Sequence, residues 1–195
     1  MTTELQETEL DKSNRAKRMM LWFGIASLIM SFAGITSAYI FSRERDDWIN
    51  NFELPEAFFW STPVIIISSL TMWLAVRKVK EGQRSMATGL LLLTFVLGLT
   101  FGFLQFMGFK QITFDLGYYF TGASSSITYT YIFLIAFVHL LHIAAALIAL
   151  AAVIYNHFKQ RYNKDNYLGL ELTATFWHFV DLLWIFLFCL LYFFR

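Results

Sequence analysis

Residues 128–158, TYTYIFLIAFVHLLHIAAALIALAAVIYNHF, form an apolar run that contains no Lys, Arg, Asp or Glu. A helix that crosses the hydrocarbon core of a bilayer needs about 20 mostly apolar residues. The run is apolar on every face and much longer than a barrel strand of about ten alternating residues. It is therefore predicted to be a transmembrane helix.

Four more runs of this kind occur along the 195 residues, and the whole sequence is 57% hydrophobic with a mean hydropathy of +0.54. Charged residues make up only 15% of the chain and gather between the runs. A soluble domain of this size could not bury so much apolar surface. We therefore expect an all-α polytopic membrane bundle, with no nucleic-acid partner. Its five transmembrane helices are predicted at about 19–41, 58–76, 86–109, 128–158 and 172–194.

Basic residues predict the orientation of this bundle, because cytoplasmic loops of membrane proteins are enriched in Lys and Arg. Eleven Lys and Arg residues precede the first run, separate the second from the third, or separate the fourth from the fifth. Only four lie on the other side. The prediction is a cytoplasmic N-terminus, with residues 1–18 as a cytoplasmic segment, and a C-terminus outside. Residues 19–195 would form the membrane domain.

Small residues suggest where the helices meet, because backbones in lipid approach closely only where side chains are small. Gly98 and Gly102 form a GxxxG pair in the third run. We predict that both glycines are packing positions.

Ionisable residues within the spans fall only on the last two helices, and such residues are functional candidates in a membrane. His139 and His142 are three apart on one helix face, as are His178 and Asp181 on the next, with Glu171 at its entrance. We expect a buried network across these two antiparallel helices. Four interpretations are open: a structural polar clamp, a proton relay, haem ligation by His142 with His178, and a di-iron site, which would need more carboxylates.

Two motifs in this region carry a family resemblance. Glu171 is followed by Trp177-His178-Phe179-Val180-Asp181 and then Trp184, and the preceding helix carries His139-x-x-His142. Together they resemble the last two helices of subunit III of the haem–copper cytochrome oxidases. The resemblance covers roughly Leu21 to the end, in the short five-helix bacterial form of the subunit.

The resemblance implies a non-redox subunit of a cytochrome c oxidase in a bacterial inner membrane. It implies no haem, copper or other metal in this chain, haem and copper in partner subunits I and II, bound phospholipid, and no catalytic residue here. The complex would reduce oxygen to water and translocate protons. Leu28 and Gly108 stand where the family usually has buried carboxylates, which weakens the case for a proton role of those two helices.

Other functions are also considered. One is subunit III of a quinol oxidase or a nitric-oxide-reductase accessory protein, and another is a small haem-b membrane anchor. A stand-alone transporter is less favoured, because Gly and Pro interrupt few of the helices.

Overall fold

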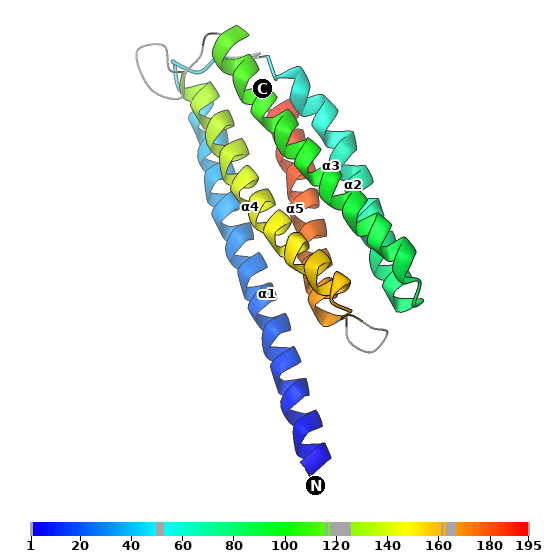
Figure 1. Cartoon of the computed structure of the whole chain (residues 1–195). Coiled ribbons are helices and arrows are strands. Elements are labelled where there is room, and N and C mark those ends of the chain that lie inside the picture. Colours follow the sequence, from blue (N-terminus) through cyan, green and yellow to red (C-terminus); the bar gives the residue numbers. More distant parts are fainter. Residues whose placement is uncertain are drawn as a thin grey trace.

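The computed structural model describes residues 2–49, 53–115, 117, 126–160, 162 and 167–194, with side chains for all of these except 2–10 and 115. These residues form helices and turns without a strand. Five helices are long and apolar enough to span a membrane, which confirms the predicted all-α class (Figure 1). The elements are α1 (Thr2–Ser42), α2 (Glu56–Lys80), α3 (Arg84–Lys110), a short π-helix η1 (Gln111–Asp115), α4 (Ile127–Phe158) and α5 (Leu168–Phe193).

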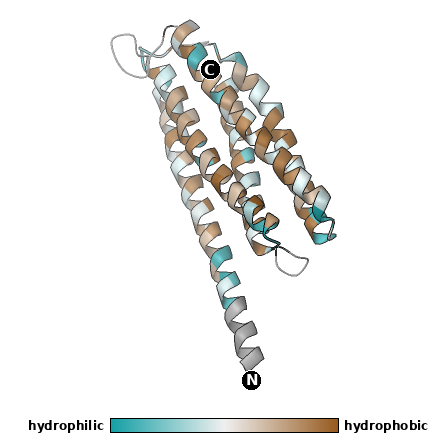
Figure 2. Cartoon of the chain, viewed as in Figure 1, coloured by the Kyte–Doolittle hydropathy of each residue, from teal (hydrophilic) through white to brown (hydrophobic). Residues whose placement is uncertain are grey.

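The first helix differs most from the sequence prediction. It begins at Thr2 rather than near residue 19, so that most of the expected polar segment 1–18 extends the helix. This segment contains no Gly or Pro that would end a helix. Figure 2 shows that the described part of α1 is hydrophilic toward its N-terminal end and more hydrophobic where it runs beside the other helices.

The helices pack as an up-and-down bundle in which α5 is central. α2 pairs most extensively with α3, while α5 contacts α2, α4 and α1 (Figure 1). α1 lies along one edge, where the described residues make their main contacts with α4 and α5. The start of α1, the turn between α2 and α3, the end of α4 and the start of α5 share one end of the bundle, which we call the basic end.

A turn at the basic end joins α2 to α3. Glu81 pairs there with Arg77 at 3.0 Å and with Lys78 at 2.8 Å. The Lys78 ammonium and the Arg77 guanidinium hold the pKa of the Glu81 carboxyl below its usual value. Gly82 follows with a φ of 77°, a conformation that glycine adopts without strain. These features explain why the chain reverses direction within a few residues.

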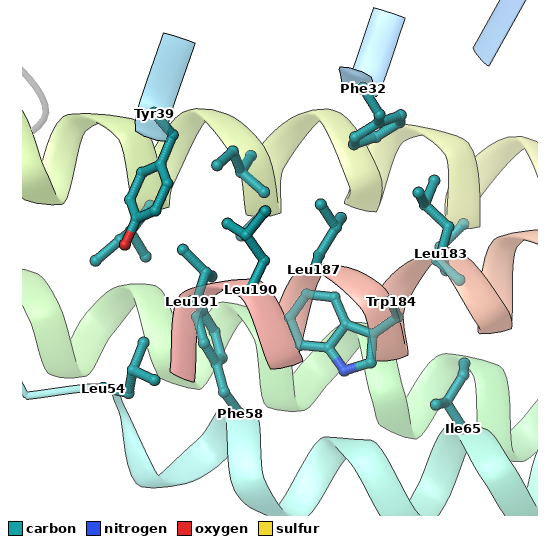
Figure 3. Close-up of a cluster of buried hydrophobic side chains, with 14 of the residues drawn as sticks. Phe32, Tyr39, Leu54, Phe58, Ile65, Leu183, Trp184, Leu187, Leu190 and Leu191 are labelled. Carbon is teal, nitrogen blue, oxygen red and sulfur yellow. The ribbon is translucent and has the colours of Figure 1, made fainter. Parts of the chain in front are cut away.

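The core lies on two sides of α5 (Figure 3). Leu183, Leu187 and Leu190 point toward α4 and α1, whereas Trp184 points toward α2. There the Trp184 ring meets Phe58 edge-to-face at 5.5 Å between centroids. Burial on both sides explains why α5 is the most deeply buried of the five candidate spans.

The two glycines of the GxxxG pair differ in packing. A Cβ at Gly98 would lie 2.6 Å from Cη2 of Trp177 and 2.9 Å from Cδ2 of Leu147. A Cβ at Gly102 would lie 3.9 Å from Cδ1 of Leu140 on α4, which is an ordinary contact. Close approach therefore occurs at Gly98 and not at Gly102, and it occurs also at Gly108, where a Cβ would meet the Phe58 ring.

Candidate functional site

Two buried tryptophans attach α5 to α2. Trp177 Nε1 donates a hydrogen bond to Ser68 Oγ at 3.2 Å, and Trp184 Nε1 donates one to Thr62 Oγ1 at 3.3 Å. Both indoles are fully buried. The tryptophans are seven residues apart, which is two helical turns, and therefore lie on the same face of α5. This face is directed at α2.

His178 makes the third contact in this row. Its Nδ1 lies 2.7 Å from Ser69 Oγ, and the tautomer of the imidazole decides which group donates. We call these three pairs, Trp177–Ser68, His178–Ser69 and Trp184–Thr62, the α2–α5 seam. In hydrocarbon a polar group without a partner is unfavourable, so each pair favours this one alignment of the two helices.

Hydroxyl groups on α2 bind α3 as well. Gln105 Nε2 donates to Ser61 Oγ at 2.9 Å, and the hydroxyls of Thr71 and Thr94 are 2.8 Å apart. The sequence interpretation did not anticipate these roles of α2. A signal was present, because hydroxyl residues occur in adjacent pairs at 61–62 and 68–69, again seven residues apart.

His139 sits in an aromatic enclosure. Its fully buried ring lies 5.1 Å from Trp184, 5.9 Å from Phe101 and 6.5 Å from Phe32, measured between centroids. Neither ring nitrogen has a hydrogen-bond partner among the described residues. His142, one turn further along, places Nδ1 2.7 Å from the Val138 carbonyl of its own helix. The two histidines share a face, as their spacing predicts, but only His139 is fully enclosed.

Asp181 lies on α5 between the two tryptophans and is 2% exposed. Neither carboxyl oxygen has a hydrogen-bond partner within the described part of the chain. The Ser69 hydroxyl is nevertheless close enough to interact with this carboxyl. Ser69 thus lies beside both His178 and Asp181, and α2 supplies the polar neighbour that we expected from α4.

The expected hydrogen-bonded network between α4 and α5 is therefore absent among the described residues. His178 is turned toward α2 and bonds Ser69, while the His142 ring packs against Phe32 of α1 at 5.6 Å. The physical reason is that Trp177 and His178, adjacent on α5, meet two adjacent hydroxyl groups on α2, those of Ser68 and Ser69. The leucine face of α5 meets α4 instead.

Glu171 is separate from this cluster. It lies at the basic end, where its carboxylate pairs with Arg18 of α1 at 2.8 Å and with Lys80 of α2 at 3.9 Å. The carboxylate is about one-third exposed. Glu171 therefore joins three helices at the surface of the bundle rather than in its interior.

Metal ligation is not suggested by the side chains that the structure places. No group of three or more His, Cys, Asp or Glu residues converges within the described part of the chain. His142 and His178, the pair that a bis-histidine haem would need, contact different helices.

Comparison with known proteins assigns the chain to a family. The model of cytochrome c oxidase subunit III matches residues 46–195. The cytochrome c oxidase subunit 3 of Tetraodon nigroviridis is 30% identical over 144 residues, which are 74% of this chain and 51% of that protein. Those of Cyprinus carpio and Pelomedusa subrufa are each 29% identical over the same shares. The chain thus spans about half the length of these curated relatives.

The matched region begins later than the resemblance drawn from the motifs, which started near Leu21. α1 lies outside the matched region, so the family match does not include Leu28, the residue compared with a family carboxylate. Residues 46–195 include α2, α3, α4 and α5, and with them both sides of the α2–α5 seam. This multi-pass membrane chain belongs to the cytochrome c oxidase subunit III family.

Proposed function

We propose that this chain is the non-redox subunit III of a respiratory terminal oxidase, a cytochrome c oxidase that reduces oxygen to water and translocates protons. The observation that carries the proposal is the family match over residues 46–195, which contains the complete α2–α5 seam. Haem and copper would be held by partner subunits I and II, and this chain would bind phospholipid and stabilise the catalytic subunit.

The packing supports a structural role for the interior of the bundle. The polar side chains of the seam bond one another, and the buried indoles of Trp177 and Trp184 fill the space between α2 and α5. The outer surface is apolar, with exposed residues such as Leu70 and Trp73 on α2 and Phe103 on α3. A rigid interior with an apolar exterior suits a subunit that packs against other membrane helices and lipid.

The electron donor and the membrane are also part of the proposal. The relatives are named for cytochrome c oxidase, which favours cytochrome c over quinol. A bacterial inner membrane is proposed as the location of this multi-pass chain. The basic end would face the cytoplasm.

Copurification tests this function. The tagged chain is expressed in its native host, extracted in mild detergent and purified. The expected result is a haem–copper catalytic subunit in the eluate, identified by its absorption spectrum and by mass spectrometry. A copper-binding subunit II in the same eluate supports cytochrome c as donor, whereas its absence points to a quinol. An eluate without a haem–copper subunit, or with one haem per isolated chain, would overturn the proposal.

Two glycine variants on the same helix sharpen this experiment. Gly98→Leu should lose the copurified haem, because the added side chain collides with Trp177 and Leu147. Gly89→Leu should keep the haem, because no atom lies within 4 Å of a Cβ at that position. Equal haem recovery from the two variants would mean that association does not depend on the packed bundle.

A further inference from the structure

A cavity of about 430 Å³ lies at the basic end, between the early turns of α1 and the start of α5. Its walls include Arg15 and Arg18 of α1, Tyr167, which precedes α5, and Glu171 of α5. We propose that this cavity binds the phosphate headgroup of an anionic phospholipid. Basic pockets between transmembrane helices at a membrane surface are suited to such headgroups.

One ion pair indicates the level at which the cavity lies relative to the membrane. Arg18 bonds Glu171 at 2.8 Å, so these residues of α1 and α5 lie at the same level. The apolar span of α1 begins with the next residue, Met19, and that of α5 begins with Leu172. The cavity therefore lies where two apolar spans begin, which is the level of lipid headgroups.

The charges leave one cation available. Glu171 is neutralised by Arg18 and lies 3.9 Å from Lys80, whose ammonium also lies over the Tyr167 ring. Arg15 has no ion pair or hydrogen bond to another described residue, and its side chain is exposed. Asp11 is the one other carboxylate in the wall. Among the described residues, Arg15, Arg18 and the nearby Lys80 are the cations of the site, Asp11 and Glu171 are its carboxylates, and the guanidinium of Arg15 is the unpaired one.

An apolar surface adjoins the same arginine. Arg15 also lines a second cavity of about 430 Å³, whose wall includes Met19. Met20, Trp22 and Phe23 follow on α1 with 63–74% of their surface exposed. A lipid with its phosphate at Arg15 would therefore have apolar surface for its acyl chains directly beyond. A soluble anion such as inorganic phosphate would gain nothing from these side chains.

The α1 side of the site lies outside the family match, whereas Tyr167 and Glu171 lie within it. Arg15 and Arg18 precede residue 46, where the match begins. The inference deepens the lipid-binding part of the proposed function, but it rests only on the membrane placement of the chain. It therefore stands even if the chain proves to have no oxidase partner.

The test is lipid retention by the detergent-purified full-length protein with its natural partners. The protein is exchanged into vesicles of phosphatidylcholine containing phosphatidylglycerol, re-extracted, and its bound lipid counted by native mass spectrometry. Arg15→Gln should lower phosphatidylglycerol retention about fivefold, the effect of about 1 kcal/mol for one basic residue at a membrane surface. Arg15→Lys should restore most of it. Lys159→Gln removes an exposed charge at the same end, away from the cavity, and should retain wild-type binding.

Three alternative results would overturn the lipid-binding proposal. Equal retention by wild type and Arg15→Gln would mean that Arg15 holds no headgroup. Displacement of the lipid by millimolar inorganic phosphate would assign the site to a free anion. A photo-crosslinker at position 15 that captures a partner subunit and no lipid would make the cavity a protein contact. Loss of the haem–copper partner with lipid binding intact would count against the proposed function and leave this inference in place.

Discussion

Gly98 lies where side chains of α4 and α5 pack against α3. Trp177 of α5 and Leu147 of α4 both lie within 3 Å of the position that a Cβ would take, a distance that real side chains almost never show. The Trp177 indole is fully buried and fixed by Ser68, so it has little room to move away. A glycine is required here for space rather than for backbone conformation.

Gly98→Ala should therefore destabilise the protein by about 1–3 kcal/mol, the usual effect of overpacking a core. Gly102→Ala should change stability by less than about 0.5 kcal/mol, because Leu140 lies at 3.9 Å and leaves room for a methyl group. Thermal unfolding of the detergent-purified protein measures both. Similar shifts for the two variants would contradict the difference in packing.

Asp181 allows a test between the clamp and the relay. A charge at the centre of a membrane helix costs about 2.5–3.5 kcal/mol on insertion scales, so an amide of the same shape should be tolerated there. We expect Asp181→Asn to keep both subunit assembly and oxygen consumption. Asp181→Leu should weaken assembly, because leucine cannot interact with the Ser69 hydroxyl.

Oxygen consumption and subunit retention of the purified complex distinguish the two interpretations. An Asn variant that stays assembled but loses most of its turnover would favour a proton relay. The two histidines differ in environment. His139 is enclosed by aromatic rings, whereas His178 contacts the Ser69 hydroxyl directly.

For single residues, the sequence predicts which side chains are buried, but it does not predict which side chains they contact. The spacing of Trp177, Asp181 and Trp184 predicts one face, and all three residues are buried. The spacing cannot say which helix lies opposite that face. Ser69 lies 109 positions before His178, and only the packing of the bundle brings the two together.

On the scale of elements, the α2–α5 seam fixes one register. Moving along α5 from Trp177 to Trp184 shifts the partner back along α2 from Ser68 to Thr62, as antiparallel helices require. A slip of one residue would separate the three pairs at once. The hydroxyls of α2 thus determine how the helix aligns, while their small size lets α5 approach.

Ser68→Ala should lower stability by about 1–3 kcal/mol, because it leaves the buried Trp177 Nε1 without an acceptor. Ser37→Ala on the exposed face of α1 is the matched control and should have almost no effect. The midpoint of unfolding in a denaturing detergent measures the difference. A Ser68 variant as stable as the control would show that the indole does not depend on this bond.

Helix ends are where the sequence prediction is least accurate. The apolar runs locate all five helices, but α1 extends to Thr2 because polar residues without Gly or Pro can continue a helix in water. α3 passes into the π-helix η1, where Gln111 Oε1 accepts a hydrogen bond from the Ala57 backbone N–H at 3.3 Å. That contact joins α2 to a residue more than fifty positions away, and no local pattern contains it.

For the whole molecule, the predicted orientation can be tested with single cysteines. Cys189 is the only cysteine and is exposed on α5, so Cys189→Ser should be tolerated and provides the background. In right-side-out vesicles a membrane-impermeant maleimide should label Asp46→Cys and leave Ser85→Cys unlabelled. Both positions are exposed and lie at opposite ends of the bundle. Labelling of Ser85→Cys without labelling of Asp46→Cys would show that the chain has the opposite orientation in the membrane.

The position of α1 at the edge of the bundle has a consequence for synthesis. α1 emerges from the ribosome before its neighbours α4 and α5, and α2 and α3 are made in between. At about 5–20 residues per second, the 84 residues between the end of α1 and the start of α4 take roughly 4–17 s to translate. Throughout that interval α1 must remain in the bilayer as a solitary helix. Its hydropathy and flanking arginines, rather than any tertiary contact, must hold it there until the later helices arrive.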